Sequence, residues 1–197
     1  MNLHLAPDQK FLDMVIHNQK LYAPKTRNKY AIFLPKGQVA PVHTKSAEVI
    51  AIPHSERKNI ESFLGDLSAF QTIYLHSIIP EYYSVVKKQP NLKYAWVLMG
   101  SEVFRASIFE SYVYEPITEQ IFIQYIKNKV RLSANPISFL KSIYRVFNQG
   151  LQEKKMSFIM KKCCYFCHFN PMDLEIIRER VNLNTKLIMY SCMTALQ

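Results

Sequence analysis

The sequence predicts an α/β fold, a Rossmann-like three-layer domain built on a mainly parallel β-sheet. Strand-like runs alternate with helical segments along the chain, which is the order that gives parallel sheets covered by helices. Several runs, such as residues 94–99, are apolar at nearly every position, as expected for strands buried on both faces. The 197 residues, of which 49% are hydrophobic, suffice for one domain with a sizeable core.

The first half of the chain predicts four strands and two helices. We expect strands at residues 2–5, 29–34, 48–52 and 71–76, with Pro35 and Pro53 closing the second and third. Pro7 and Asp8 are expected to open a helix over residues 9–19, because Phe11, Leu12, Val15 and Ile16 share one helical face. Ser55 is expected to cap a second helix that ends near residue 65.

The second half continues the alternation. Pro80 begins a helix to about residue 88, and residues 93–99 form the fifth strand. Residues 101–135 are expected to hold one or two short helices, and Pro136 opens a long helix to about residue 159. Strands at 163–168 and 186–190 flank a helix that Pro171 opens. The sequence contains no G-x-G-x-x-G or Walker loop, so it shows no standard nucleotide site.

Polar residues follow two of the predicted strands directly. The run 94–99 stops at Gly100 and is followed by Ser101 and Glu102, and the run 71–76 ends at His76 and Ser77. Open α/β sheets bind ligands at the carboxyl ends of their strands, so these positions predict a site. A loop carboxylate and a capping histidine are the alternative interpretation, and the pattern does not decide between the two.

The positive charge is concentrated in one segment. The chain carries a formal net charge of +10, and residues 124–162 hold nine basic residues and one acid, a net +8. Aromatic residues are interleaved with these charges, among them Phe139, Tyr144, Phe147 and Phe158. Such a segment suits an anionic membrane surface or a nucleic acid, or it is a solvated face over an ordinary core. We favour the membrane surface and expect no nucleic-acid partner.

The four cysteines predict buried thiols and no metal site. Cys164, Cys167 and His168 match the C-x-x-C-H pattern of haem attachment, but they lie in an apolar, strand-like run. No second pair of Cys or His stands at a spacing that would complete a metal site. The N-terminus lacks the features of a signal peptide and no run is long enough to span a bilayer, so we expect a cytoplasmic chain.

Four segments, in order along nearly the whole chain, resemble one enzyme family. They are LHLAPDQKFLDMVI, IYLHSIIP, WVLMGSEVF and the closing HFNPMDLEII with NTKLIMYS. Together they resemble the N-terminal half of the TDP-N-acetylfucosamine:lipid II N-acetylfucosaminyltransferases, also called 4-α-L-fucosyltransferases. The family pattern has Trp, Gly, Asp and an aromatic residue where this chain has Trp96, Gly100, Glu102 and Phe104.

This resemblance implies a GT-B glycosyltransferase of surface polysaccharide synthesis. Its N-terminal domain would face a lipid-linked sugar acceptor at the inner face of the cell membrane. A C-terminal domain would bind the TDP-sugar donor, and the reaction would need no metal or other cofactor. We therefore expect residues 1–190 to form the acceptor-side domain, residues 191–197 a tail, and the donor domain to be absent. The alternative is a non-catalytic basic module that binds a membrane surface or a partner.

Such a sugar-transfer reaction gives candidate roles to the polar residues at the strand ends. Glu102 and His76 are the catalytic candidates, because an inverting transfer needs a general base for the acceptor hydroxyl. Gly100, Ser101, Ser77 and Asp8 are the candidate acceptor-binding residues. For Asp8, as for Asp173, we favour helix capping or first-turn charge stabilisation over a role in binding. Glu102 stands where the family has Asp, which keeps a carboxylate but moves it by one methylene.

Overall fold

The computed structural model describes residues 1–99, 136–168, 174–175, 177–178, 183 and 185–189. Within the long helix at 136–162, side chains are described for residue 148 and from residue 150 onward. The predictions for residues 100–135, which include Gly100, Ser101 and Glu102, lie outside these ranges.

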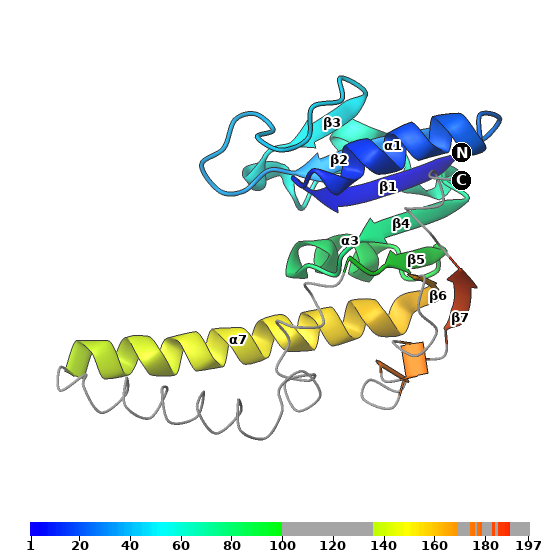
Figure 1. Ribbon diagram of the computed structural model, residues 1–197. Coiled ribbons are helices and arrows are strands. Elements are labelled where there is room, and N and C mark those ends of the chain that lie inside the picture. Colours follow the sequence, from blue (N-terminus) through cyan, green and yellow to red (C-terminus); the bar gives the residue numbers. More distant parts are fainter. Residues whose placement is uncertain (100–135, 169–173, 176, 179–182, 184, 190–197) are drawn as a thin grey trace, which may run out of the picture.

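A seven-stranded, all-parallel sheet forms the centre of the molecule (Figure 1), so the predicted fold class is confirmed. The strand order is β3-β2-β1-β4-β5-β6-β7. The strands are β1 (Asn2–Pro7), β2 (Asn28–Phe33), β3 (Val49–Ile52), β4 (Thr72–His76), β5 (Tyr94–Val97), β6 (Cys163–His168) and β7 (Lys186–Met189). Because all strands run the same way, their carboxyl ends lie along one edge, as predicted for the strands that end near residues 76, 99 and 168.

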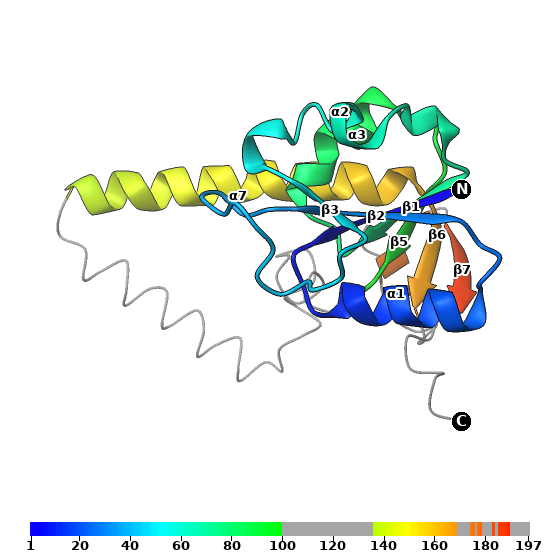
Figure 2. The ribbon, with the colours of Figure 1, turned by 90° about the horizontal axis from the view of Figure 1, so that it is seen from above.

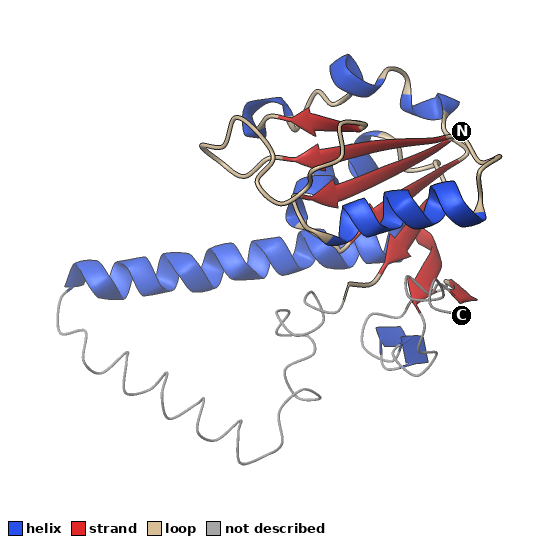
Figure 3. Ribbon diagram, turned by 45° about the horizontal axis from the view of Figure 1, so that its top comes forward, coloured by secondary structure: helices blue, strands red, loops and turns tan. Residues whose placement is uncertain are grey.

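Helices cover both faces of the sheet and complete the three layers (Figure 2). Helix α1 (Phe11–Tyr22) lies on one face, and α2 (Glu61–Leu64), α3 (Tyr83–Lys88) and α7 (Pro136–Lys162) lie on the other. The short 3₁₀ helices are η1 (His54–Glu56), η2 (Leu67–Ala69) and η3 (Pro80–Tyr82). Figure 3 shows that the first part of α7 extends well beyond the sheet.

The core has two sides because successive side chains of a strand point to opposite faces. Leu3, Leu5, Leu75 and Trp96 belong to the larger cluster, which packs against α2, α3 and α7. The smaller cluster lies under α1 and contains, for example, Ile32 from β2. Trp96 is fully buried and packs edge-on to the ring of Phe166, with centroids 5.0 Å apart, which ties β5 to β6.

Two predicted helices begin or continue differently in the structure. Pro7 does not open α1, because it extends β1 and pairs with Phe33, and the helix starts at Phe11. Ser55 does not cap a helix over residues 55–65, and η1 and α2 occupy that stretch separately. Arg57, which lies between these two elements, donates a side-chain hydrogen bond to the Leu34 carbonyl oxygen.

Candidate functional site

The strand order creates a topological switch point between β1 and β4. From β1 the chain passes through α1 on one face, whereas from β4 it passes through η3 and α3 on the other. The pair of Leu5 with Leu75 is the last one in the register of β1 with β4. A crevice at the carboxyl ends of two such strands is the usual ligand position in this class of sheet.

Ser77 lies at this switch point in an unfavourable backbone conformation. Its φ is +62°, in the left-handed region, which costs a residue with a Cβ atom roughly 1–2 kcal/mol. The Ser77 N–H donates to the Val97 carbonyl oxygen at 3.0 Å, which fixes the turn against β5. Only 3% of Ser77 is exposed, and its hydroxyl has no hydrogen-bond partner among the described residues. Strain and an unsatisfied polar group together are typical of functional positions.

Tyr82 joins the two strand ends beneath the switch point. Its fully buried hydroxyl lies 3.1 Å from the Leu5 carbonyl oxygen and 3.2 Å from that of His76, and it donates to them. The ring packs against Phe33, with centroids 5.6 Å apart. Sequence reasoning missed Tyr82, because nothing in the local pattern shows that a helix-start tyrosine reaches two neighbouring strands.

The side chain of His76 lies next to that of His4, on the face of the sheet that α1 covers. Nδ1 of His4 and Nε2 of His76 are 2.9 Å apart, and the His4 ring stacks on Tyr74 with centroids 4.6 Å apart. Burial lowers the pKa of His4 to about 4, although a hydrogen bond to the side chain of Asn28 acts in the opposite direction. Burial, with the neighbouring His4, also lowers the pKa of His76 well below its usual value. Both rings are therefore neutral near pH 7, and so weak a base suits a positioning role better than proton abstraction.

Asp8 anchors the long loop that follows β2. Its carboxylate accepts backbone N–H bonds from Val42 (2.6 Å), His43 (3.1 Å) and Thr44 (2.8 Å). Burial of the Asp8 carboxyl raises its pKa, but these backbone bonds outweigh that effect and hold the pKa below its usual value. Asp8 caps no helix, and its oxygens are already occupied by the loop that borders the carboxyl edge.

The described cysteines mostly behave as small buried hydrophobes, as predicted. Cys163 and Cys167 are buried, whereas Cys164 is exposed, so the prediction was wrong for that residue. Burial raises the pKa of Cys167 to about 12 and raises that of Cys163 further. Among the described residues, no cluster of His, Cys, Asp and Glu could hold a metal ion.

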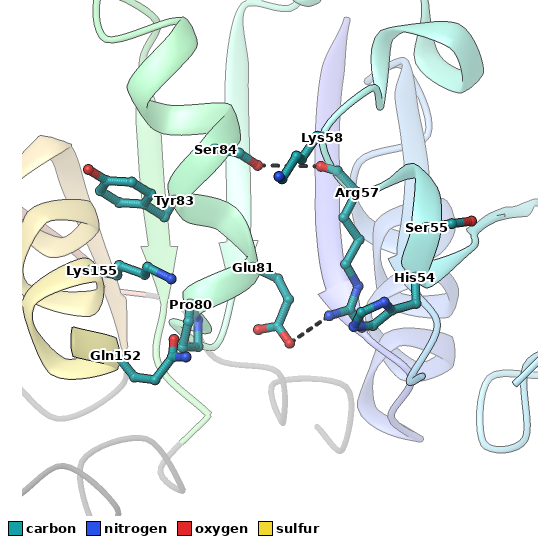
Figure 4. Close-up of a pocket in the computed structure, with 10 residues that line it drawn as sticks. All are labelled: His54, Ser55, Arg57, Lys58, Pro80, Glu81, Tyr83, Ser84, Gln152 and Lys155. Atoms are coloured by element: carbon teal, nitrogen blue, oxygen red, sulfur yellow. Dashed lines mark hydrogen bonds and ion pairs between the residues drawn. The ribbon is translucent and has the colours of Figure 1, made fainter. Parts of the chain in front are cut away.

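A basic groove opens on the sheet face that carries α3 and α7. It encloses about 660 Å³ and is bordered by three segments: the chain after β3, the chain after β4, and the middle of α7. Figure 4 shows these side chains, with Glu81 directed at the Arg57 guanidinium. The lining residues are His54, Ser55, Arg57 and Lys58 from the first segment, Pro80, Glu81, Tyr83 and Ser84 from the second, and Gln152 and Lys155 from α7.

Sequence reasoning missed this groove, although two of its segments begin directly after strand ends. His54 lies two residues after β3, and Pro80 lies four residues after β4. The strand-end rule that selected His76 and Ser77 therefore also points to residues 54–58 and 80–84. The contribution of α7 was not predictable in this way, because residues 152 and 155 lie in the middle of a helix.

No protein-family model matches the chain, and no curated protein matches it either. In the part of the chain that the structure describes, every helix is too short or too polar to cross a bilayer. The family resemblance of the four sequence segments thus stays a prediction.

Proposed function

We propose that this domain is the acceptor side of a glycosyltransferase that moves a deoxy-amino sugar from a TDP-sugar to a lipid-linked acceptor. The observation that carries the proposal is Ser77, whose buried hydroxyl has no hydrogen-bond partner in the described part of the chain and whose backbone is strained at the β1–β4 switch point. The same residue lies in IYLHSIIP, one of the segments that resemble the transferase family. Geometry and resemblance therefore select the same position.

In this proposal the residues at the carboxyl edge have separate tasks. Ser77 hydrogen-bonds the acceptor sugar, while the His4–His76 pair and Tyr82 hold the turn that presents Ser77. The acceptor oxygen bonds to the anomeric carbon of the donor, and the bond from that carbon to the diphosphate oxygen breaks. In an inverting route the hydroxyl proton passes to a carboxylate, for which Glu102 is the candidate.

The test distinguishes the effect of the Ser77 hydroxyl from the effect of the strained backbone at that residue. Ser77→Ala and Ser77→Gly both remove the hydroxyl, but only glycine accepts a φ of +62° without a penalty. We expect both variants to bind a short-chain, lipid-linked sugar analogue roughly fivefold to tenfold more weakly than the wild-type chain, by calorimetry. Both variants should gain stability in urea unfolding, because each removes a buried hydroxyl that has no partner among the described residues, and Ser77→Gly should gain about 1 kcal/mol more than Ser77→Ala because it also relieves the strain.

The exposed Ser62 on α2 provides the control, and Ser62→Ala should bind the analogue as the wild type does. If the wild-type chain does not bind the analogue, or if both Ser77 variants bind it unchanged, the proposed role of this domain is wrong.

A non-catalytic module that binds an anionic membrane surface is the second candidate. The observation in its favour is the exposure of Lys154, Lys161 and Lys162 on the described part of α7. Phe158, by contrast, packs inward against Tyr83, with centroids 5.3 Å apart, and is not available to insert into lipid. A chain that sediments with anionic but not neutral vesicles, and does not bind the sugar analogue, would favour this candidate.

A further inference from the structure

We propose that the groove between the η1 segment, α3 and α7 binds a phosphate-bearing ligand, with Lys58 and Lys155 supplying the charge. This inference does not rest on the transferase proposal, because the residues assigned roles at the switch point do not line the groove.

The charges of the groove do not balance. Arg57, Lys58 and Lys155 line it, and Glu81 is the one carboxylate among its described lining residues. Glu81 is already paired with Arg57, since Oε1 and Nη1 lie 2.8 Å apart. The two lysines therefore add positive charge that no carboxylate among the described lining residues neutralises. An anion that enters between them would meet two cations from opposite walls.

Arg57 is held rigidly beside these lysines. Besides Glu81, it donates through Nη2 to the Leu34 carbonyl oxygen at 2.6 Å, and its guanidinium lies over the Phe33 ring, 5.9 Å from the centroid. The side chain is 15% exposed, and its Nε is buried without a partner among the described residues. An arginine held by these contacts has little side-chain entropy left to lose, so this wall of the groove is already in place when a ligand binds.

Neutral polar groups surround the cations and fit the rest of such a ligand. Ser55 presents a hydroxyl, whereas that of Ser84 donates to the Arg57 carbonyl oxygen at 3.4 Å. The Oε1 atom of Gln152 is buried without a partner among the described residues. An amide oxygen accepts hydrogen bonds, so it complements a hydroxyl and repels a phosphate. Together with the volume of about 660 Å³, this favours a ligand that joins phosphate to a hydroxylated group, such as a sugar phosphate or sugar diphosphate.

The test uses the 197-residue chain with inorganic pyrophosphate as the probe and isothermal calorimetry as the readout. Lys58→Gln and Lys155→Gln each remove one cation of the groove while keeping a long polar side chain. We expect the double variant to bind pyrophosphate at least roughly tenfold more weakly than the wild type. Lys154→Gln is the matched control: it is exposed on the same helix, beside Lys155, and does not line the groove.

Vesicles of phosphatidylcholine with and without phosphatidylglycerol then identify the source of the phosphate. Binding to anionic vesicles that the double variant loses and Lys154→Gln keeps indicates a lipid headgroup. A soluble ligand is indicated by two results together. The double variant loses pyrophosphate binding, and vesicle binding is either absent or equal in all variants. The proposal is overturned if the wild type binds neither probe, or if Lys154→Gln weakens binding as much as the double variant does.

Discussion

The switch point and the basic groove both follow strand ends, yet their polar side chains meet opposite environments. At the switch point, His4, His76 and Ser77 are buried and carry no charge near pH 7. In the groove, Lys58 is exposed and Lys155 is only partly buried, so water still reaches both. Removing a charge from water is costly, so the sheet interior keeps neutral groups that fix geometry. The open groove can keep full charges, which suits long-range attraction of an anion.

The largest expected effect is acid sensitivity of the switch point. The pKa of His4 is about 4 in the folded chain and near 6.5 when unfolded. Between these values the unfolded chain binds a proton that the folded chain does not, so stability falls as the pH falls from 6.5 towards 4. His4 alone accounts for a loss of up to roughly 3 kcal/mol, and His76 acts in the same direction.

Urea unfolding at several pH values between 7.5 and 4.5 measures this loss. His4→Gln should flatten the pH dependence, although it also lowers stability at pH 7 by removing the stack on Tyr74. His17→Gln changes an exposed histidine of α1 and should leave the slope unchanged. An unaltered slope in His4→Gln would show that the buried pair does not set the acid sensitivity. Asp8 contributes only at lower pH, where its carboxylate is protonated.

The next effect concerns the hydroxyl that joins β1 to β4. Tyr82→Phe keeps the ring against Phe33 but leaves the carbonyl oxygens of Leu5 and His76 without this donor. We expect a loss of about 1–2 kcal/mol in the free energy of unfolding. Tyr22→Phe, at an exposed position of α1, is the control and should change stability little. Equal effects from the two substitutions would mean that Tyr82 packs there without joining the strands.

The smallest effect on stability is expected in the groove. Glu81→Gln removes the carboxylate that pairs with Arg57, and because Glu81 is partly exposed, the loss should stay below about 1 kcal/mol. The affinity for pyrophosphate should rise about threefold or more, because a negative charge is removed from the site. Glu61→Gln, outside the groove, should leave the affinity unchanged. Weaker pyrophosphate binding by Glu81→Gln would show that the carboxylate organises the groove instead of opposing anions.

The local sequence pattern predicted the helices and strands well, because hydrophobic periodicity and residues that end helices or strands, such as proline, act over a few residues. The strand at 163–168 and the start of the long helix at Pro136 agree with the structure to the residue. The early end of β5 at Val97, two residues before the predicted end, shows the limit, since its pairing with β6 stops there. Ser77 directly follows β4, as predicted, but its positive φ and its hydroxyl, which lacks a partner among the described residues, depend on β5 and on the surrounding packing.

The sequence by itself determined the alternation of apolar strands and helices, the parallel sheet, and the concentration of positive charge towards α7. Only the tertiary structure decided which strands are neighbours. It brought His4 beside His76, bound Asp8 to the amides of residues 42–44, and assembled the groove from segments near residues 55, 82 and 153. Such contacts join positions far apart in the chain, so they depend on how the faces of the sheet and helices pack together, which no local pattern of residues specifies.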